Sequence, residues 1–201
     1  SGTFPYTVTT QSNCTDVSAT GTITVIAQPT ITLSSAVNTD AQTICEQTLL
    51  TNISYTLGGS ATGATVTGLP NGVTGTYSAG VFTISGTPTQ FGTFPYTVTT
   101  QSNCTDVSAT GTITVIAQPT IALSSAANTN AQSFCINNTL TNITYALSGS
   151  ATGATVTGLP NGVTGTYSAG VFTISGTPTQ SGTFPYTVTT QSNCTDVSAT
   201  G

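Results

Sequence analysis

The 201-residue chain contains no lysine, no arginine and no histidine, and it also lacks tryptophan and methionine. Without basic side chains it cannot neutralise a polyanion, so we expect no binding to nucleic acids or to acidic lipid surfaces. Without histidine or lysine, its many serine and threonine hydroxyls have no ordinary general base to activate them. The composition therefore predicts a protein that is not an enzyme and carries no cofactor.

Charge is almost absent, and all of it is acidic. The net charge of −5 comes from five side chains: Asp16, Asp40, Glu46, Asp106 and Asp196. Because there is no histidine and no cluster of carboxylates, no metal site is predicted. Asp40 and Glu46 are replaced by uncharged residues in the next copy of the repeat described below, so they are not a shared catalytic pair. Asp106 and Asp196 each follow a cysteine by two residues, and we expect them to form turns.

Long apolar runs are missing as well. The longest stretches resemble Ile23–Ala27, which is itself interrupted by a threonine. A membrane-spanning helix needs about 20 apolar residues. We therefore expect no membrane insertion in this segment.

The chain repeats itself with a period of 90 residues. The string Ser1–Gly21 returns at Phe91–Gly111 with one change and at Ser181–Gly201 with none. Between positions 1–90 and 91–180 only 13 residues differ, and apart from the first position all differences lie between Thr32 and Gly58. A fixed period of this length indicates an array of like structural units.

Proline marks the expected junctions, at Gln28-Pro29 and Gln118-Pro119, because it cannot continue a strand ladder and fixes its own backbone angle. We expect residues 1–28 to be the C-terminal part of a preceding repeat. Residues 29–118 are expected to form a complete repeat, and residues 119–201 a repeat that lacks its last strand. Such short linkers predict a semi-rigid rod.

Within one repeat, short alternating segments follow one another between turn signals. Threonine alone accounts for 50 of the 201 residues, and threonine, valine, isoleucine, tyrosine and phenylalanine suit a pleated, half-buried surface. No segment has helical spacing of apolar residues. The chain is therefore predicted to be all-β, as tandem β-sandwich domains of about 90 residues each. The expected strands are Thr30–Ser34, Asn52–Leu57, Thr65–Thr67, Thr74–Tyr77, Val81–Ser85, the segment around Phe94–Val98, and Thr112–Ile116. Pro95 predicts an edge position or a bulge in its strand.

Five cysteines alternate in spacing, with 31, 59, 31 and 59 residues between Cys14, Cys45, Cys104, Cys135 and Cys194. This pattern predicts a disulfide framework and an oxidising, extracellular setting. The junctions above favour pairing within repeats, Cys45 with Cys104 and Cys135 with Cys194, which leaves Cys14 to a partner outside the sequence. A bond from Cys104 to Cys135 across a junction also leaves one orphan, so the count alone does not decide between them.

Three motifs carry a resemblance. The runs Ala64–Val73, Phe82–Thr89 and Gly92–Thr99 resemble the immunoglobulin-like tandem repeats of giant bacterial cell-surface adhesins of gliding bacteria. The resemblance implies an immunoglobulin-like sandwich in a secreted surface protein. The chain departs from antibody-type domains, since it has no core tryptophan and Tyr96 precedes Cys104 by eight residues instead of two.

Three functions follow as hypotheses. The first is a structural stalk that extends the binding tip of a large adhesin and aids attachment or surface motility, with neighbouring repeats as its partners. The second is a subunit of a self-assembling extracellular filament, joined through sheet edges. The third is a glycan- or ice-binding module, with the variable stretch between Thr32 and Gly58 as its face.

Overall fold

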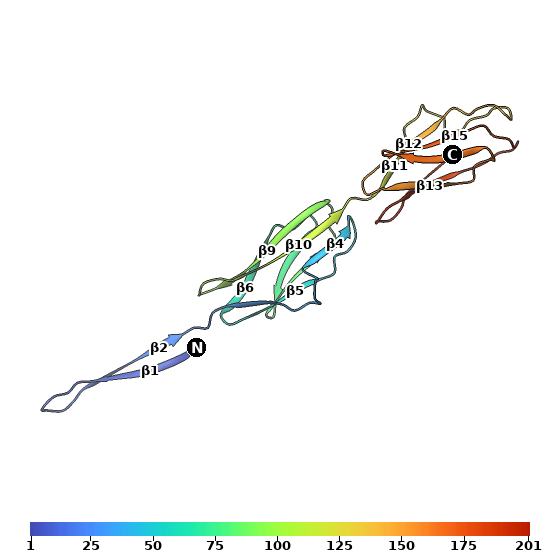
Figure 1. Cartoon of the computed structure of the whole chain (residues 1–201). Coiled ribbons are helices and arrows are strands. Elements are labelled where there is room, and N and C mark those ends of the chain that lie inside the picture. The colour runs from blue at the N-terminus through green and yellow to red at the C-terminus, as the bar shows by residue number, and fades with distance from the viewer. The chain divides into compact units, whose positions relative to one another are not determined.

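The computed structural model describes residues 1–201, and it consists of strands and loops without a helix (Figure 1). Contacts divide the chain into two compact units. The first comprises residues 1–42, 49–89 and 93–114, and the second comprises residues 43–48, 90–92 and 115–201. The expected repeat boundaries at Pro29 and Pro119 stay predictions, as does the rod. No helix has the length and apolar character needed to cross a membrane.

The first full repeat contains two four-stranded sheets. One has the order β3-β5-β8-β7 and the other the order β4-β10-β9-β6. Lettered in chain order, β3 to β10 are strands A, A′, B, C, D, E, F and G. The two sheets are then A-B-E-D and A′-G-F-C, which is the strand order of an immunoglobulin domain. The predicted immunoglobulin-like β-sandwich is therefore confirmed. The strands are β3 (Thr30–Leu33), β4 (Ala41–Cys45), β5 (Ile53–Gly58), β6 (Ala61–Thr67), β7 (Val73–Ser78), β8 (Val81–Gly86), β9 (Gly92–Ser102) and β10 (Ser108–Ile116).

Alternation along each strand builds the core. In β5, Ile53, Tyr55 and Leu57 point inward, while the residues between them are exposed or half-buried. This is the period of two that places one face of a strand on a core. The buried core of the repeat is completed by Leu50, Val73, Phe82, Ile84, Tyr96, Val98, Ile113 and Val115.

A tight hairpin joins β7 and β8, with Ser78 paired to Val81. Its two central residues, Ala79 and Gly80, have φ angles of 48° and 83°. Positive φ at both central positions is characteristic of the type I′ turn, whose twist matches the twist of the two strands that it joins. Glycine supplies the second position without strain, whereas Ala79 occupies a region that alanine seldom adopts.

The second repeat has the same plan with shorter strands. One sheet has the order β11-β12-β15-β14, and the other, β13-β16-β17, has three strands. The last strand of this sheet is the short β17, whose residues pair with β16. The strands are β11 (Thr120–Leu123), β12 (Ile143–Ser148), β13 (Gly153–Thr157), β14 (Val163–Ser168), β15 (Val171–Gly176), β16 (Thr187–Gln191) and β17 (Ser198–Thr200).

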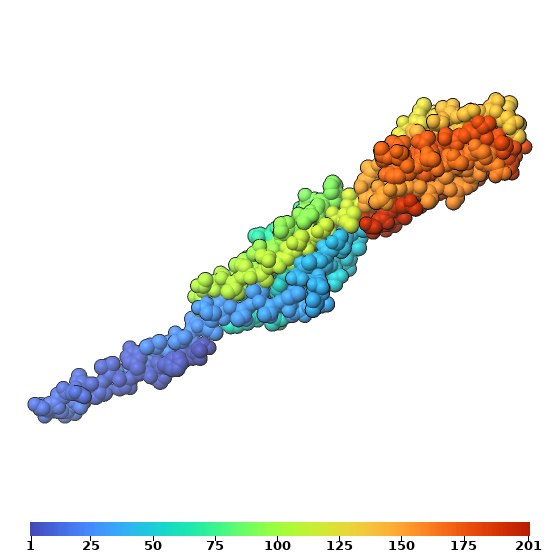
Figure 2. Space-filling view, in the orientation of Figure 1, coloured from blue at the N-terminus to red at the C-terminus, as the bar shows by residue number.

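At the other end of the sequence, β1 (Gly2–Thr9) and β2 (Ser18–Val25) form a two-stranded antiparallel hairpin. Its sequence is that of β9 and β10, but no second sheet covers it, and it is a thin ribbon in Figure 2. Side chains that are buried in the full repeat are consequently exposed here. Ile23 is 58% exposed, whereas its counterpart Ile113 is fully buried.

Two features differ from the sequence-based expectation. Pro95 lies in β9, which is a central strand of its sheet and not an edge. The proline is tolerated because the ladder between β6 and β9 ends at Thr67 and Thr97, so Pro95 lies beyond it. The strand β4 was not predicted, because its polar sequence AQTIC lacks a clear alternation of apolar residues.

Candidate functional site: the cysteine loops

The loop between β9 and β10 is a small polar structure that holds a cysteine. The backbone N–H of Cys104 donates to the Ser102 hydroxyl at 3.1 Å. The same hydroxyl lies 3.0 Å from Asp106 Oδ1, and the Thr100 hydroxyl donates to that oxygen at 3.3 Å. Thr100 also accepts the N–H of Val107 at 3.0 Å. The carboxylate is thus a loop-forming group, as the sequence predicted.

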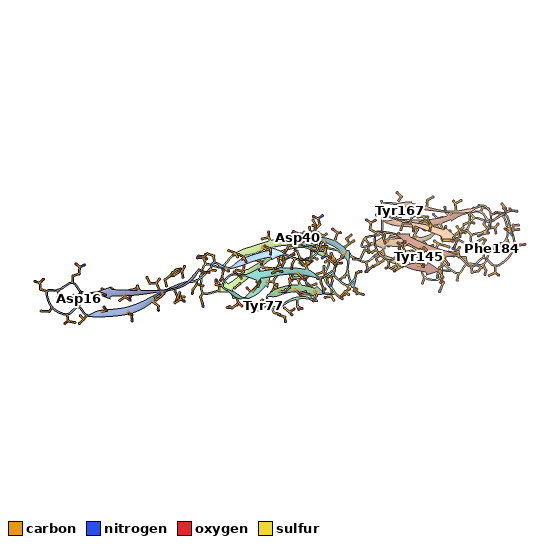
Figure 3. All side chains as sticks on the ribbon, turned by 90° about the horizontal axis from the view of Figure 1, so that it is seen from below. Asp16, Asp40, Tyr77, Tyr145, Tyr167 and Phe184 are labelled. Carbon is orange, nitrogen blue, oxygen red and sulfur yellow. A yellow bond between two sulfur atoms is a disulfide. The ribbon has the colours of Figure 1, made fainter.

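The same loop occurs at the two corresponding places in the chain. Cys194 N donates to Ser192 at 3.1 Å, and Ser192 lies 3.0 Å from Asp196. In the β1–β2 hairpin, Cys14 N donates to the hydroxyl of Ser12 at 3.2 Å. The hairpin loop with Asp16 is visible at one end of the β1–β2 ribbon in Figure 3. Because short polar side chains satisfy the backbone locally, each loop presents its cysteine in the same way.

One disulfide is present, between Cys45 and Cys194. Their Cα atoms are 5.7 Å apart, within the usual range for a disulfide. By their contacts both cysteines belong to the second unit. Cys14, Cys104 and Cys135 are free.

This pairing corrects the predicted bond between Cys45 and Cys104. Cys45 ends β4, next to the end of β10, because Glu46 N donates to the carbonyl oxygen of Ile116 at 2.8 Å. Cys104 lies in the loop before β10 begins at Ser108. The two cysteines are therefore separated by the length of β10, about 26 Å at 3.3 Å per residue. A disulfide needs Cα atoms within about 7 Å.

The predicted bond between Cys135 and Cys194 is likewise absent, since Cys194 is bonded to Cys45. The Cys104–Cys135 alternative is not formed either. Cys135 is exposed, and the segment before it forms no strand, unlike β4. In the first repeat β4 pairs with β10, and the sequence ends at Gly201, before the counterparts of Thr112–Ile116.

The two sheets are joined by a pair of tyrosines. The hydroxyls of Tyr55 on β5 and Tyr96 on β9 are 2.9 Å apart and buried. Tyr145 and Tyr186 repeat this contact at 3.0 Å in the second repeat, where Tyr145 lies between the sheets (Figure 3). Strands β5 and β9 correspond to strands B and F, which an antibody domain joins by its disulfide. The tyrosine pair thus occupies the place of that disulfide, and the cysteines lie elsewhere.

Burial changes the acidity of these phenols. It raises the pKa of Tyr96 well above its usual value of 10.0, and the hydrogen bond to Tyr55 raises it further. Burial also raises the pKa of Tyr55, although its hydrogen bond to Tyr96 acts in the opposite direction. Burial raises the pKa of Tyr186 in the second repeat. The pair is therefore protonated over the whole neutral range and acts as a hydrogen-bonded core contact.

Nothing else in the chain gathers reactive groups. No three His, Cys, Asp or Glu side chains lie together in the arrangement of a metal site. Asp40, an exception to the otherwise repeated carboxylates, acts through its backbone, since its carbonyl oxygen accepts from Thr112 N at 2.8 Å. Asn130, which replaces it in the next repeat, has the same backbone carbonyl group.

No protein-family model matches the chain, and no curated protein matches it. Similar solved structures include the titin domains Z1Z2 in complex with telethonin, with 12% identity, coverage of 89% of this chain and 95% of that chain, and a TM-score of 0.39. Dpr2 Ig1-Ig2 in complex with DIP-Theta Ig1-Ig3 has 14% identity, coverage of 98% and 71%, and a TM-score of 0.40. The endo-fucoidan hydrolase MfFcnA4 has 14% identity, coverage of 99% and 33%, and a TM-score of 0.34. The chain's own strand order, described above, assigns it to the immunoglobulin-like β-sandwiches.

Proposed function

We propose that this chain is a stretch of spacer domains in the stalk of a large extracellular surface adhesin, without catalytic activity of its own. The observation that carries the proposal is the distribution of differences between copies. Strands β6, β7 and β8 are identical in sequence to their counterparts, and all variation beyond the first position lies between Thr32 and Gly58. A spacer requires a repeated fold of fixed size and no unique residue, which fits this distribution.

An extracellular location is supported by the disulfide and by the composition. Disulfides persist in oxidising compartments and are rare in the cytosol. The absence of lysine and arginine leaves no site for trypsin-like proteases. Exposed threonine and serine, such as the paired hydroxyls of Thr99 and Ser108 at 2.9 Å, keep the sheet surface polar without charge.

The test is electron microscopy of producing cells, labelled with an antibody against the repeat. Thin threads rooted in the cell envelope are expected, and their length should change when repeats are deleted from the gene. Label confined to the cell interior, or attachment that is unaffected by deletion of repeats, would contradict a stalk. Small-angle scattering of the purified chain should give an elongated monomer.

A filament subunit is the second candidate, favoured by the β1–β2 hairpin. Its apolar side chains, which include Tyr6, Val8 and Ile23, are exposed although their counterparts form a core. Such a hairpin could be covered by the sheet of another chain. The scattering experiment separates the two candidates, because a filament subunit would increase in mass with concentration, whereas a stalk segment would stay monomeric.

A further inference from the structure

The single disulfide leaves three cysteines of a regular pattern free, and the repeat explains why. We propose that the disulfides form a ladder, in which the first cysteine of each repeat bonds to the second cysteine of the next repeat, 149 residues later. Cys45–Cys194 is one rung of this ladder. The same spacing, counted back from Cys14 and Cys104 or forward from Cys135, falls outside residues 1–201. Each free cysteine is therefore half of a rung whose partner is another copy of the repeat.

The geometry of the cysteine loop supports this assignment, because the loop has the same conformation whether or not its cysteine forms a disulfide. In the bonded loop Cys194 N lies 3.1 Å from the Ser192 hydroxyl. In the free loop the corresponding distance, from Cys104 N to Ser102, is also 3.1 Å. The carboxylates of Asp196 and Asp106 make the same 3.0 Å contact. The loop around Cys104 thus already has the conformation that accepts a disulfide.

The surroundings of Cys104 supply a second, independent observation. Its thiol donates to the carbonyl oxygen of Ala27 at 3.6 Å, which places it beside the end of β2. In the next repeat the counterpart of Ala27 is Ala117, which directly follows Ile116. Ile116 is the residue that accepts the N–H of Glu46 and so holds Cys45 at its position.

The contact between Glu46 and Ile116 has an equivalent one repeat earlier in the array. There the first cysteine of the preceding copy lies beside Ile26, the counterpart of Ile116. This is next to Ala27, which Cys104 contacts. Both halves of a rung therefore converge on the same short segment, the end of the last strand before the junction proline. The occupant that fits beside Cys104 is the segment corresponding to Thr43–Thr48 in the preceding copy. In this chain that segment already belongs by its contacts to the unit that follows.

Formation of a rung is an oxidation. Two thiols lose two protons and two electrons as the S–S bond forms, and the electrons reduce the disulfide of an oxidised thiol reagent or oxidoreductase to two thiols. Oxidised glutathione is sufficient as this oxidant in vitro. The proposal does not depend on the stalk function, since a filament subunit could carry the same ladder.

A count of free thiols tests the ladder directly. The chain is refolded with reduced and oxidised glutathione, and then alkylated in denaturant without reductant. Intact mass should reveal three cysteines that are alkylated or glutathione-capped, whereas pairing within repeats leaves only Cys14. A count of one, or of five, would overturn the proposal.

A longer chain tests the open rung at Cys104. When one full period is added before Ser1, the number of disulfides should rise from one to two while three cysteines stay free. Pairing within repeats predicts a single free cysteine in both chains. In the longer chain Cys104 should become protected from alkylation.

Peptide mapping identifies the partners. Chymotrypsin cleaves after Tyr186 and releases Cys194 in Thr187–Gly201, whereas the peptide that begins at Thr97 carries Cys104 and continues beyond Gly111. The two otherwise identical loops are thereby separated by mass. As matched variants, Cys45→Ser should expose Cys194, and Cys104→Ser should leave the rung intact. Protection of Cys104 only in covalent dimers on a non-reducing gel would refute a ladder within one chain.

Discussion

Identical sequence in two burial states allows a stringent test of the core. Ile113 in β10 and Ile23 in β2 lie in the same string SATGTITVI, yet Ile113 is fully buried and Ile23 is 58% exposed. Replacing Ile113 by valine removes one buried methylene, which costs about 1 kcal/mol from lost transfer free energy and the small cavity that remains. Intrinsic strand propensity changes equally at both sites, so Ile23→Val is a control for everything except burial.

The expected result is a decrease in Tm of about 4–8 °C for Ile113→Val, because a unit of this size loses that much per kcal/mol. Ile23→Val should change Tm by less than about 1–2 °C, consistent with a surface substitution. Thermal unfolding followed by circular dichroism measures both. Equal losses at the two positions would refute the reasoning, because they would mean that the hairpin is as well covered as the sandwich.

Three further predictions follow from single residues. In urea unfolding, Gly59→Ala should destabilise the fold by at least about 1 kcal/mol more than Gly80→Ala. Both glycines have positive φ, but only at Gly59 would an added Cβ collide with a backbone carbonyl, that of Gln28. Stability should fall as the pH rises above about 10, because burial holds the pKa of Tyr96 above 10.0 in the folded state, and a free energy of urea unfolding that is the same at about pH 9 and about pH 11 would contradict this. Asp106→Ala should cost about 1 kcal/mol through its lost loop hydrogen bonds, whereas Asp40→Asn, the residue of the next repeat, should cost under about 0.5 kcal/mol by the same urea assay.

Local pattern was enough for most of the fold. The alternation of Ile53, Tyr55 and Leu57 and the glycine turn at Gly80 each predict a structure that depends on a few neighbouring residues. The short strand β4 was missed for the same reason. Its position depends on pairing with β10, almost 70 residues later, and its own sequence carries little hydrophobic signal.

The disulfide could not be predicted from spacing. Counting cysteines assigns them to repeats but does not reveal that Cys45 and Cys104 lie at opposite ends of β10. The tyrosine pair was also missed, although two identical motifs carried the signal. Tyr55 and Tyr96 recur as Tyr145 and Tyr186, always on strands that correspond to B and F. Knowledge of strand order, which one sequence does not supply, was needed to recognise that they meet.

The bond from Cys45 to Cys194 has a mechanical consequence. It closes a loop across a sequence separation of 149 residues, which would span roughly 500 Å if fully extended. When the chain is pulled from its ends, tension passes through the two sulfur atoms and bypasses everything between them. The strands β5–β10 of the first repeat and β11–β16 of the second lie inside this loop, so the load does not reach them while the bond is intact. Reduction would release this stored length, and the extensibility of the protein would then depend on the redox state of its surroundings.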